Sequence, residues 1–166
     1  MDILSLHKSS KALFHLKEEI IQFALDTEAD RIHLGDFDLM IRDPEAFLIS
    51  VENQSKGVDL PEGWVPHTMF WYVLNNSRII GSVDMRHYLT PALEDLGGHI
   101  GYVVRPGERS KGYATSMVAK AIPEARDLGI KELLITAASD NVASRKVIEK
   151  NGGILEEERF SHLAGR

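Results

Sequence analysis

A run of basic residues and glycines separates a strand-like segment from a helix-like one in the second half of the chain. Residues 99–104, HIGYVV, have the apolar and β-branched composition of a buried strand. Residues 113–128, YATSMVAKAIPEARDL, repeat apolar side chains at three- and four-residue steps, which is typical of an amphipathic helix. The polar segment RPGERSKG lies between them. This order predicts a strand and a helix joined by a loop at the helix N-terminus.

The loop RPGERSKG has the features of an anion site. A helix N-terminus presents unpaired N–H groups and the positive end of the helix dipole, which favours phosphate. Gly112 lets the backbone approach a phosphate closely, and Arg109 and Lys111 add positive charge. The alternative is an ordinary turn with solvated basic residues. Neither G-x-x-x-x-G-K-[ST] nor G-x-G-x-x-G is present, so a nucleotide-binding module is a weak hypothesis.

The other segments predict an α/β (α+β) fold with one mixed, mostly antiparallel central sheet. The order after residue 65 is β-β-β-α-β-α, so the last strand should pair in parallel through a β-α-β unit. Pro123 should kink or split its helix, because proline removes a main-chain hydrogen bond. The expected strands are residues 2–6, 69–74, 78–85, 99–104 and 131–138, and the expected helices are residues 11–30, 44–52, 113–128 and 141–150.

Composition limits the classes of function. The 166 residues fit one domain, and the formal net charge of -6 argues against a partner such as duplex nucleic acid. The chain has no cysteine, which excludes thiolate catalysis and fits a cytoplasmic protein. We expect no membrane partner, because no segment has the roughly 20 apolar residues of a span, and no secretory signal at the N-terminus. The seven histidines show no metal-binding spacing, so no metal site is predicted.

Two motifs in register resemble the GNAT superfamily of acyl-CoA-dependent N-acyltransferases. RSKGYA, residues 109–114, matches the R/Q-x-x-G-x-G/A motif, and SDNVASRKVIEKNGG, residues 139–153, resembles the segment after the next strand. Residues 61–106 also resemble one bacterial branch of predicted acetyltransferases. The resemblance implies a single GNAT-like domain over residues 1–166, helices on both faces of the sheet, and acetyl-CoA (coenzyme A) as co-substrate with no metal.

The resemblance also implies which residues bind the cofactor. In the family, the motif loop binds the pyrophosphate through backbone amides, and the preceding strand end pairs with the pantetheine arm as an added strand would. Asn141 would contact the pantetheine, although an ordinary helix N-cap is the alternative. Arg145 and Lys146 would reach the 3′-phosphate or adenine end. The implied cofactor-binding residues are Val103, Val104, Arg109, Ser110, Lys111, Gly112, Tyr113, Ala114, Thr115, Asn141, Ser144 and Lys146.

The acid and base of the reaction are less evident. Many relatives have a tyrosine acid before the Glu-Lys pair of the last helix, where this chain has Ile148. His99 is our predicted general base, because it lies near the position of a glutamate in relatives and an imidazole titrates near neutral pH. The alternative is a packed strand histidine. Tyr102 is an alternative acid or a core aromatic.

The acceptor site should lie in the less patterned parts of the chain. Trp64, Trp71 and His87 are predicted to line its pocket, with core packing as the alternative for the tryptophans and plain solvation for His87, Glu94 and Asp95. The predicted function is N-acetyl transfer from acetyl-CoA to a primary amine of a small molecule or peptide, by direct attack in a ternary complex. The alternative is a CoA-binding regulatory or sensor module with little catalysis. Because only one short strand fits after residue 153, either the sheet is shorter or a segment of another subunit completes it, and the second case gives the hypothesis of a homodimer.

Overall fold

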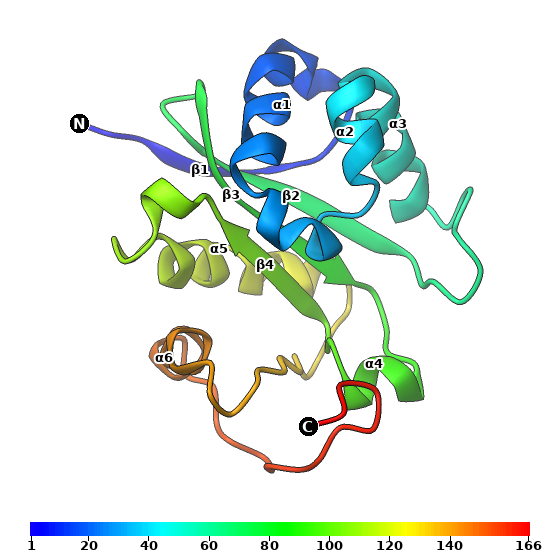
Figure 1. The fold of residues 1–166 in the computed structure, drawn as a ribbon, viewed down its shortest axis with the longest axis vertical. Coiled ribbons are helices and arrows are strands. Elements are labelled where there is room, and N and C mark those ends of the chain that lie inside the picture. Colours follow the sequence, from blue (N-terminus) through cyan, green and yellow to red (C-terminus); the bar gives the residue numbers. More distant parts are fainter.

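Four antiparallel strands form the centre of the molecule, in the order β1-β2-β3-β4 (Figure 1). The computed structural model describes the backbone of residues 1–166 and all side chains except those of residues 31–33. Each strand pairs with its neighbour in sequence, so β1 and β4 are the outer strands. The strands are β1 (Leu4–Lys8), β2 (His67–Leu74), β3 (Arg78–Arg86) and β4 (Ile100–Val104).

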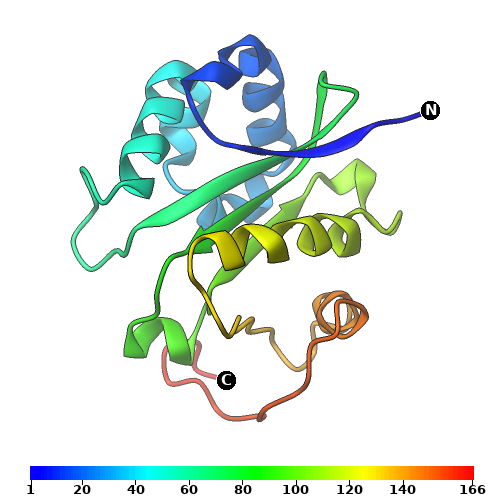
Figure 2. The same ribbon diagram turned by 180° about the vertical axis from the view of Figure 1, so that it is seen from behind.

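Helices cover both faces of the sheet, as predicted. Figures 1 and 2 show α1, α2 and α3 against one face and α5 against the other. α6 packs on α5, and α4 lies in the connection between β3 and β4. The bounds are α1 (Lys17–Asp26), α2 (Phe37–Arg42), α3 (Pro44–Ser55), α4 (Pro91–Asp95), α5 (Tyr113–Asp127) and α6 (Val142–Lys150), with short 3₁₀ turns η1 (Lys11–Leu16), η2 (Glu28–His33) and η3 (Pro106–Glu108).

Side chains point alternately to the two faces of the sheet and so divide the apolar core into two clusters. Trp71 and Val73 of β2 face α1 and α3, whereas Phe70 and Tyr72 face α5. Successive side chains of a strand point to opposite faces, so an apolar strand in the middle of the sheet contributes to both clusters. The mixed α/β fold class is therefore confirmed.

The predicted parallel strand over residues 131–138 is not formed. His99 donates its N–H to the Leu134 carbonyl at 2.8 Å, but the Leu134 N–H donates to Nδ1 of the His99 ring at 3.0 Å. A side chain thus takes the donor that a parallel ladder would use, and the ladder does not extend. Gly98, with a φ of 60°, allows this close approach, because a Cβ there would lie 2.5 Å from the Leu134 carbonyl oxygen.

Three other expectations need correction. The first helix ends at Asp26 and is followed by η2, and α5 runs continuously through the exposed Pro123 instead of splitting there. No strand forms after residue 153, where Ile154 and Leu155 are 91% and 73% exposed. Within the described residues, no helix is long and apolar enough to span a bilayer.

Candidate active site

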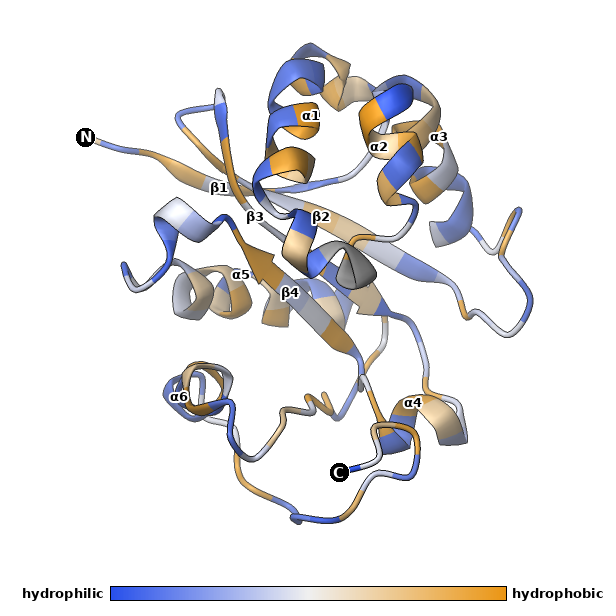
Figure 3. Ribbon diagram, viewed as in Figure 1, coloured by the Kyte–Doolittle hydropathy of each residue, from blue (hydrophilic) through white to orange (hydrophobic). Residues whose placement is uncertain are grey.

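The loop between β4 and α5 presents main-chain N–H groups to open space. Ser110 and Gly112 have φ values of 62° and 82°, and Gly112 is the N-cap of α5. No side chain caps this helix, so N–H groups of its first turn have no partner in the described residues. Left-handed residues before a helix turn successive N–H groups toward one point and create an anion-binding concavity. Figure 3 shows the hydrophobic β4 leading into this hydrophilic loop.

The basic side chains of the loop are paired with carboxylates. Arg109 donates to Asp30 at 2.6 Å and to the Val104 carbonyl oxygen at 3.0 Å. Lys111 donates to Glu108 at 2.8 Å, and this bond is the main reason that the pKa of Glu108 is lowered. The positive potential of the loop therefore comes mainly from its N–H groups and the helix dipole, whereas sequence reasoning counted Arg109 and Lys111 as free charges.

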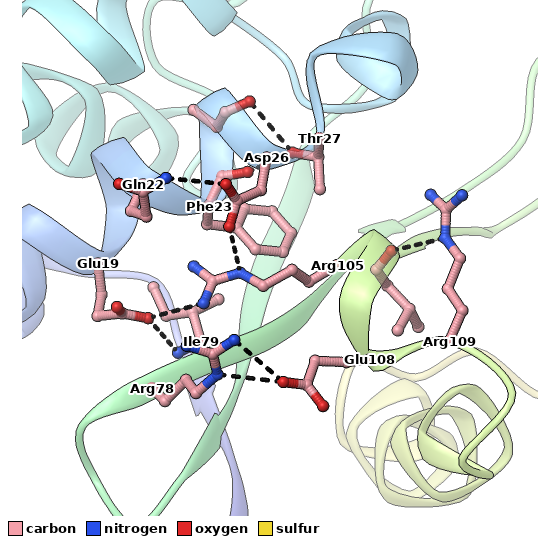
Figure 4. A network of polar contacts seen from close by, with 12 residues as sticks. Glu19, Gln22, Phe23, Asp26, Thr27, Arg78, Ile79, Arg105, Glu108 and Arg109 are labelled. Atoms are coloured by element: carbon pink, nitrogen blue, oxygen red, sulfur yellow. Dashed lines mark hydrogen bonds and ion pairs between the residues drawn. The ribbon is translucent and has the colours of Figure 1, made fainter.

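Arg105 fixes the start of the loop to α1. Its guanidinium is 2% exposed and lies 3.2 Å from both Glu19 and Asp26, against the ring of Phe23 (Figure 4). Its N–H bonds do not point at the carboxylate oxygens, so the contacts are ion pairs without well-aligned hydrogen bonds. Glu19 also accepts from the Ile79 N–H at 2.9 Å, which ties α1 to β3 as well.

The outer edge of β4 carries unpaired main-chain groups. The main-chain N–H of Arg86 donates to the His99 carbonyl, and the main-chain N–H of Arg105 donates to the Ile80 carbonyl. These two bonds show which residues of β4 face β3 in the ladder. Because the ladder alternates, Tyr102 and Val104 direct their N–H groups to the outer edge, whereas Val103 pairs with β3. An extended ligand arm added to this edge would therefore contact Tyr102 and Val104 rather than Val103. Arg109 already occupies the Val104 carbonyl.

The second motif docks α6 beside the loop. Asn141 caps α6 by accepting the Ser144 N–H at 3.1 Å. The helix N-cap was the alternative to a pantetheine contact in the sequence analysis. The Ser144 hydroxyl is 2.7 Å from the Tyr102 hydroxyl, so a side-chain bridge joins β4 to α6. Asn151, which sequence reasoning missed, donates to the Thr115 carbonyl of α5 at 3.2 Å. Lys146 is exposed at the surface of α6.

His99 has partners that affect its predicted role. Its Nδ1 accepts the Leu134 N–H, so the neutral ring carries its proton on Nε2. Burial lowers the pKa of His99, and the positive charge of Arg86 lowers it further. A neutral imidazole whose free lone pair is already in a hydrogen bond is poorly placed to accept another proton. The base role of His99 stays a prediction.

A pocket of about 310 Å³ lies on the face of the sheet that α1–α3 cover. Trp64, which is 49% exposed, is among its lining residues. Asp84 and His67 lie on its floor, with Asp84 Oδ1 2.5 Å from His67 Nδ1 and Gln54 2.9 Å from His67 Nε2. The lining residues are Leu34, Gly35, Val51, Gly63, Trp64, Val65, His67, Met69, Asp84, Arg86, Thr90, Ala92 and Leu93.

Two residues that the sequence suggested for an acceptor pocket, Trp71 and His87, do not line this cavity. Trp71 is fully buried in the core against Phe23 and Phe47, and its indole N–H donates to Ser9. His87 is not among the lining residues, and its Nε2 is 2.8 Å from the Thr68 hydroxyl. Sequence reasoning overlooked His67, Asp84 and Arg86. Asp84 and Arg86 did give a signal, because two charged residues at alternate positions of an apolar strand share one face.

The pocket and the anion loop meet along β4. Asp84 of the pocket is paired across the ladder with Gly101, over which the guanidinium of Arg86, another lining residue, lies. Val104 is three residues farther along the same strand and leads directly into the loop. A ligand bound to the loop and extended along β4 would thus bring its far end beside Asp84.

The residues of the chain match one family model. Residues 17–154 match the acetyltransferase (GNAT) domain. The chain belongs to the GNAT family of acetyltransferases. Its GNAT fold is shared with the aminoglycoside N-acetyltransferase AAC(6')-Iy in complex with CoA, at 18% identity and a TM-score of 0.57 over 96% of this chain and 93% of that one.

A second solved structure has the same GNAT fold. The putative acetyltransferase YycN from Bacillus subtilis is 17% identical, with a TM-score of 0.52 over 96% of this chain and 97% of that one. No curated protein matches the chain significantly. The family match confirms the resemblance inferred from RSKGYA and SDNVASRKVIEKNGG.

Proposed function

We propose that this GNAT acetyltransferase moves an acetyl group from acetyl-CoA to a primary amine, by direct attack in a ternary complex. The observation that carries the proposal is the junction at Gly101, where the outer edge of β4 meets the pocket that holds Asp84. N–H groups at the start of α5 would bind the pyrophosphate, and the Tyr102 and Val104 edge would bind the pantetheine arm. The pocket would hold the amine.

Asp84 is placed to accept the proton of the ammonium group. Its Oδ1 is bonded to His67, but Oδ2 has no partner in the described residues. His67 is 5% exposed and held by Gln54, so it fixes the orientation of the carboxylate. Once the amine is neutral, its nitrogen bonds to the thioester carbonyl carbon and the C–S bond breaks. The nitrogen then loses a second proton to give the amide, and the CoA thiolate takes up one proton to leave as the thiol. Proximity supplies much of the rate, and the base supplies about 10²- to 10⁴-fold.

The test is thiol release from acetyl-CoA with a panel of amino acids, polyamines, aminoglycosides and N-terminal peptides. Asp84→Asn should lower kcat by about 10²-fold or more while CoA affinity, measured by calorimetry, stays unchanged. His99→Asn, which keeps an acceptor for the Leu134 N–H, is the matched variant for the competing base. The base would be His99 if kcat lost its pH dependence in His99→Asn while Asp84→Asn kept both its activity and its pH dependence.

The alternative function remains a sensor of CoA or acyl-CoA. Arg109 and Lys111 engage carboxylates of this chain, and a regulatory ligand would have to compete with these contacts. Tight CoA binding without thiol release for any amine would favour the sensor. Failure to bind CoA would exclude both functions.

The proposal treats residues 1–166 as one cytoplasmic acetyltransferase domain that forms a homodimer. A second copy would cover the exposed Ile154 and Leu155, which lie on the segment after α6. Light scattering at micromolar concentration should give twice the mass of the chain. A monomer mass in wild type would exclude the dimer without affecting the proposed reaction.

A further inference from the structure

The described lining of the pocket contains only three side chains that can carry charge. They are His67, Asp84 and Arg86, and the remaining lining is apolar apart from Thr90 and two glycines. Asp84 is already bonded to the imidazole of His67. Arg86, in contrast, has no carboxylate within ion-pair distance among the described side chains. Arg86 is therefore a positive charge without an ion-pair partner in the described part of the pocket.

The Arg86 guanidinium is held in place with part of its donor set unused. Nη1 donates to the carbonyl oxygens of Gly97 and Gly98 at 3.1 and 3.2 Å, which fixes the plane of the group. Nη2 and Nε have no partner in the described residues. The group lies over Gly101, where a Cβ would be 3.7 Å from both Nη1 and Nη2. An oriented guanidinium with two free donors matches the geometry of a carboxylate.

We propose that the acceptor amine also carries a carboxylate, which Arg86 binds, so that the substrate is an amino acid or a similar zwitterion. The proposal rests on the proposed acetyl transfer to an amine. Arg86 and Asp84 are two residues apart on the same face of β3, so their backbones are about 6–7 Å apart. That spacing lets one small molecule place its carboxylate at Arg86 and its amine at Asp84. The apolar walls, including Leu93 and Met69, suit an apolar side chain.

The same charges oppose a polycationic acceptor. A second ammonium group near Arg86 would face a like charge in a half-buried site, where screening by water is weak. Only one carboxylate, Asp84, is available in the described lining to attract cations, and it is bonded to His67. A zwitterion instead satisfies both charged groups.

The experiment compares each amino acid with the amine that lacks its carboxylate. The pairs are leucine with 3-methylbutylamine and phenylalanine with 2-phenylethylamine, with spermidine as the polycation, assayed by thiol release from acetyl-CoA. We expect kcat/KM to be about 10- to 100-fold higher for the amino acids, as two charge-assisted hydrogen bonds would give. Equal rates within each pair would overturn the role of Arg86 and leave the proposed acetyl transfer intact.

Two variants separate binding of the carboxylate from a structural role of Arg86. Arg86→Gln should remove the preference by raising KM for the amino acids, while the amines change little. Arg86→Glu should reverse the preference toward spermidine, which a merely destabilised pocket would not do. Arg126→Gln on the exposed side of α5 is the control and should keep the wild-type preference.

A calorimetric measurement keeps the two proposals distinguishable. If no amine is acetylated, the proposed function fails, and the same pairs are titrated into protein saturated with CoA. Binding of leucine that is lost in Arg86→Gln would still support the carboxylate site. Absence of binding, or equal binding of leucine and 3-methylbutylamine, would overturn it.

Discussion

Gly112 offers the most direct test of the anion site at the start of α5. It has a φ of 82° and no atom within 4 Å of the position that a Cβ would take. Gly129, at the other end of the same helix, has a φ of 81° and equally open surroundings. Substitution of either glycine by aspartate thus introduces the same side chain and similar backbone strain, but only Gly112→Asp places a carboxylate beside the free N–H groups.

The two variants should lose similar stability and differ in affinity for CoA. A residue with a side chain in the left-handed region costs about 1–2 kcal/mol, which lowers Tm by roughly 2–8 °C in a chain of this size. A charge 4 Å from one phosphate charge costs about 1 kcal/mol in water and about 4 kcal/mol near a protein surface. The Kd of CoA should therefore rise about 5- to 1000-fold in Gly112→Asp and change little in Gly129→Asp.

Isothermal titration calorimetry with CoA, beside thermal unfolding of each variant, measures both effects. The weakening should shrink as salt is raised, because salt screens the repulsion at an exposed loop. Folded Gly112→Asp with a wild-type Kd for CoA would show that the pyrophosphate binds elsewhere. Equal weakening in both variants would show that strain, and not charge at the loop, is responsible.

Two further predictions concern the contact between β4 and residues 131–138. Because the pKa of His99 is lowered below 6.5, the unfolded chain binds its proton more readily, and stability should fall as pH drops below about 6.5. The asparagine in His99→Asn cannot titrate, so the free energy of unfolding of this variant in urea should fall less between pH 7.5 and 5.5 than that of the wild type. An equal fall in the two proteins would refute the prediction. Gly98→Ala should cost about 2 kcal/mol or more, since strain adds to the clash with Leu134. Gly63 also has a positive φ, but a Cβ there would meet no atom within 4 Å, so Gly63→Ala should unfold at a higher urea concentration than Gly98→Ala. Equal midpoints for the two variants would contradict the clash.

Local patterns in the sequence were sufficient for the elements around the cofactor loop. The apolar run before Arg105, the left-handed glycine at position 112 and the amphipathic stripe of α5 all depend on contacts between near neighbours. The capping role of Asn141 is local for the same reason, since its partner is Ser144. Such features are encoded by residues a few positions apart and can be inferred from spacing.

The predicted strand over residues 131–138 failed for a reason that spacing does not contain. Its composition is that of a strand, but pairing depends on which donor the neighbouring segment offers, and the His99 side chain takes the Leu134 N–H. The location of Trp71 was left open between pocket and core for a related reason. A tryptophan on an apolar strand fits both a pocket and a core, and packing of Phe23 and Phe47 over it decides for the core.

The sequence by itself determined the family, the strand–loop–helix unit and the kind of ligand that the loop favours. Only the tertiary structure brought Asp84, His67 and Gln54 together, because these residues belong to β3, β2 and α3. It also paired Arg109 with Asp30, 79 positions away, and gave Arg86 no acidic partner among the described side chains. Charges act through space, so their compensation depends on long-range packing that no local pattern records.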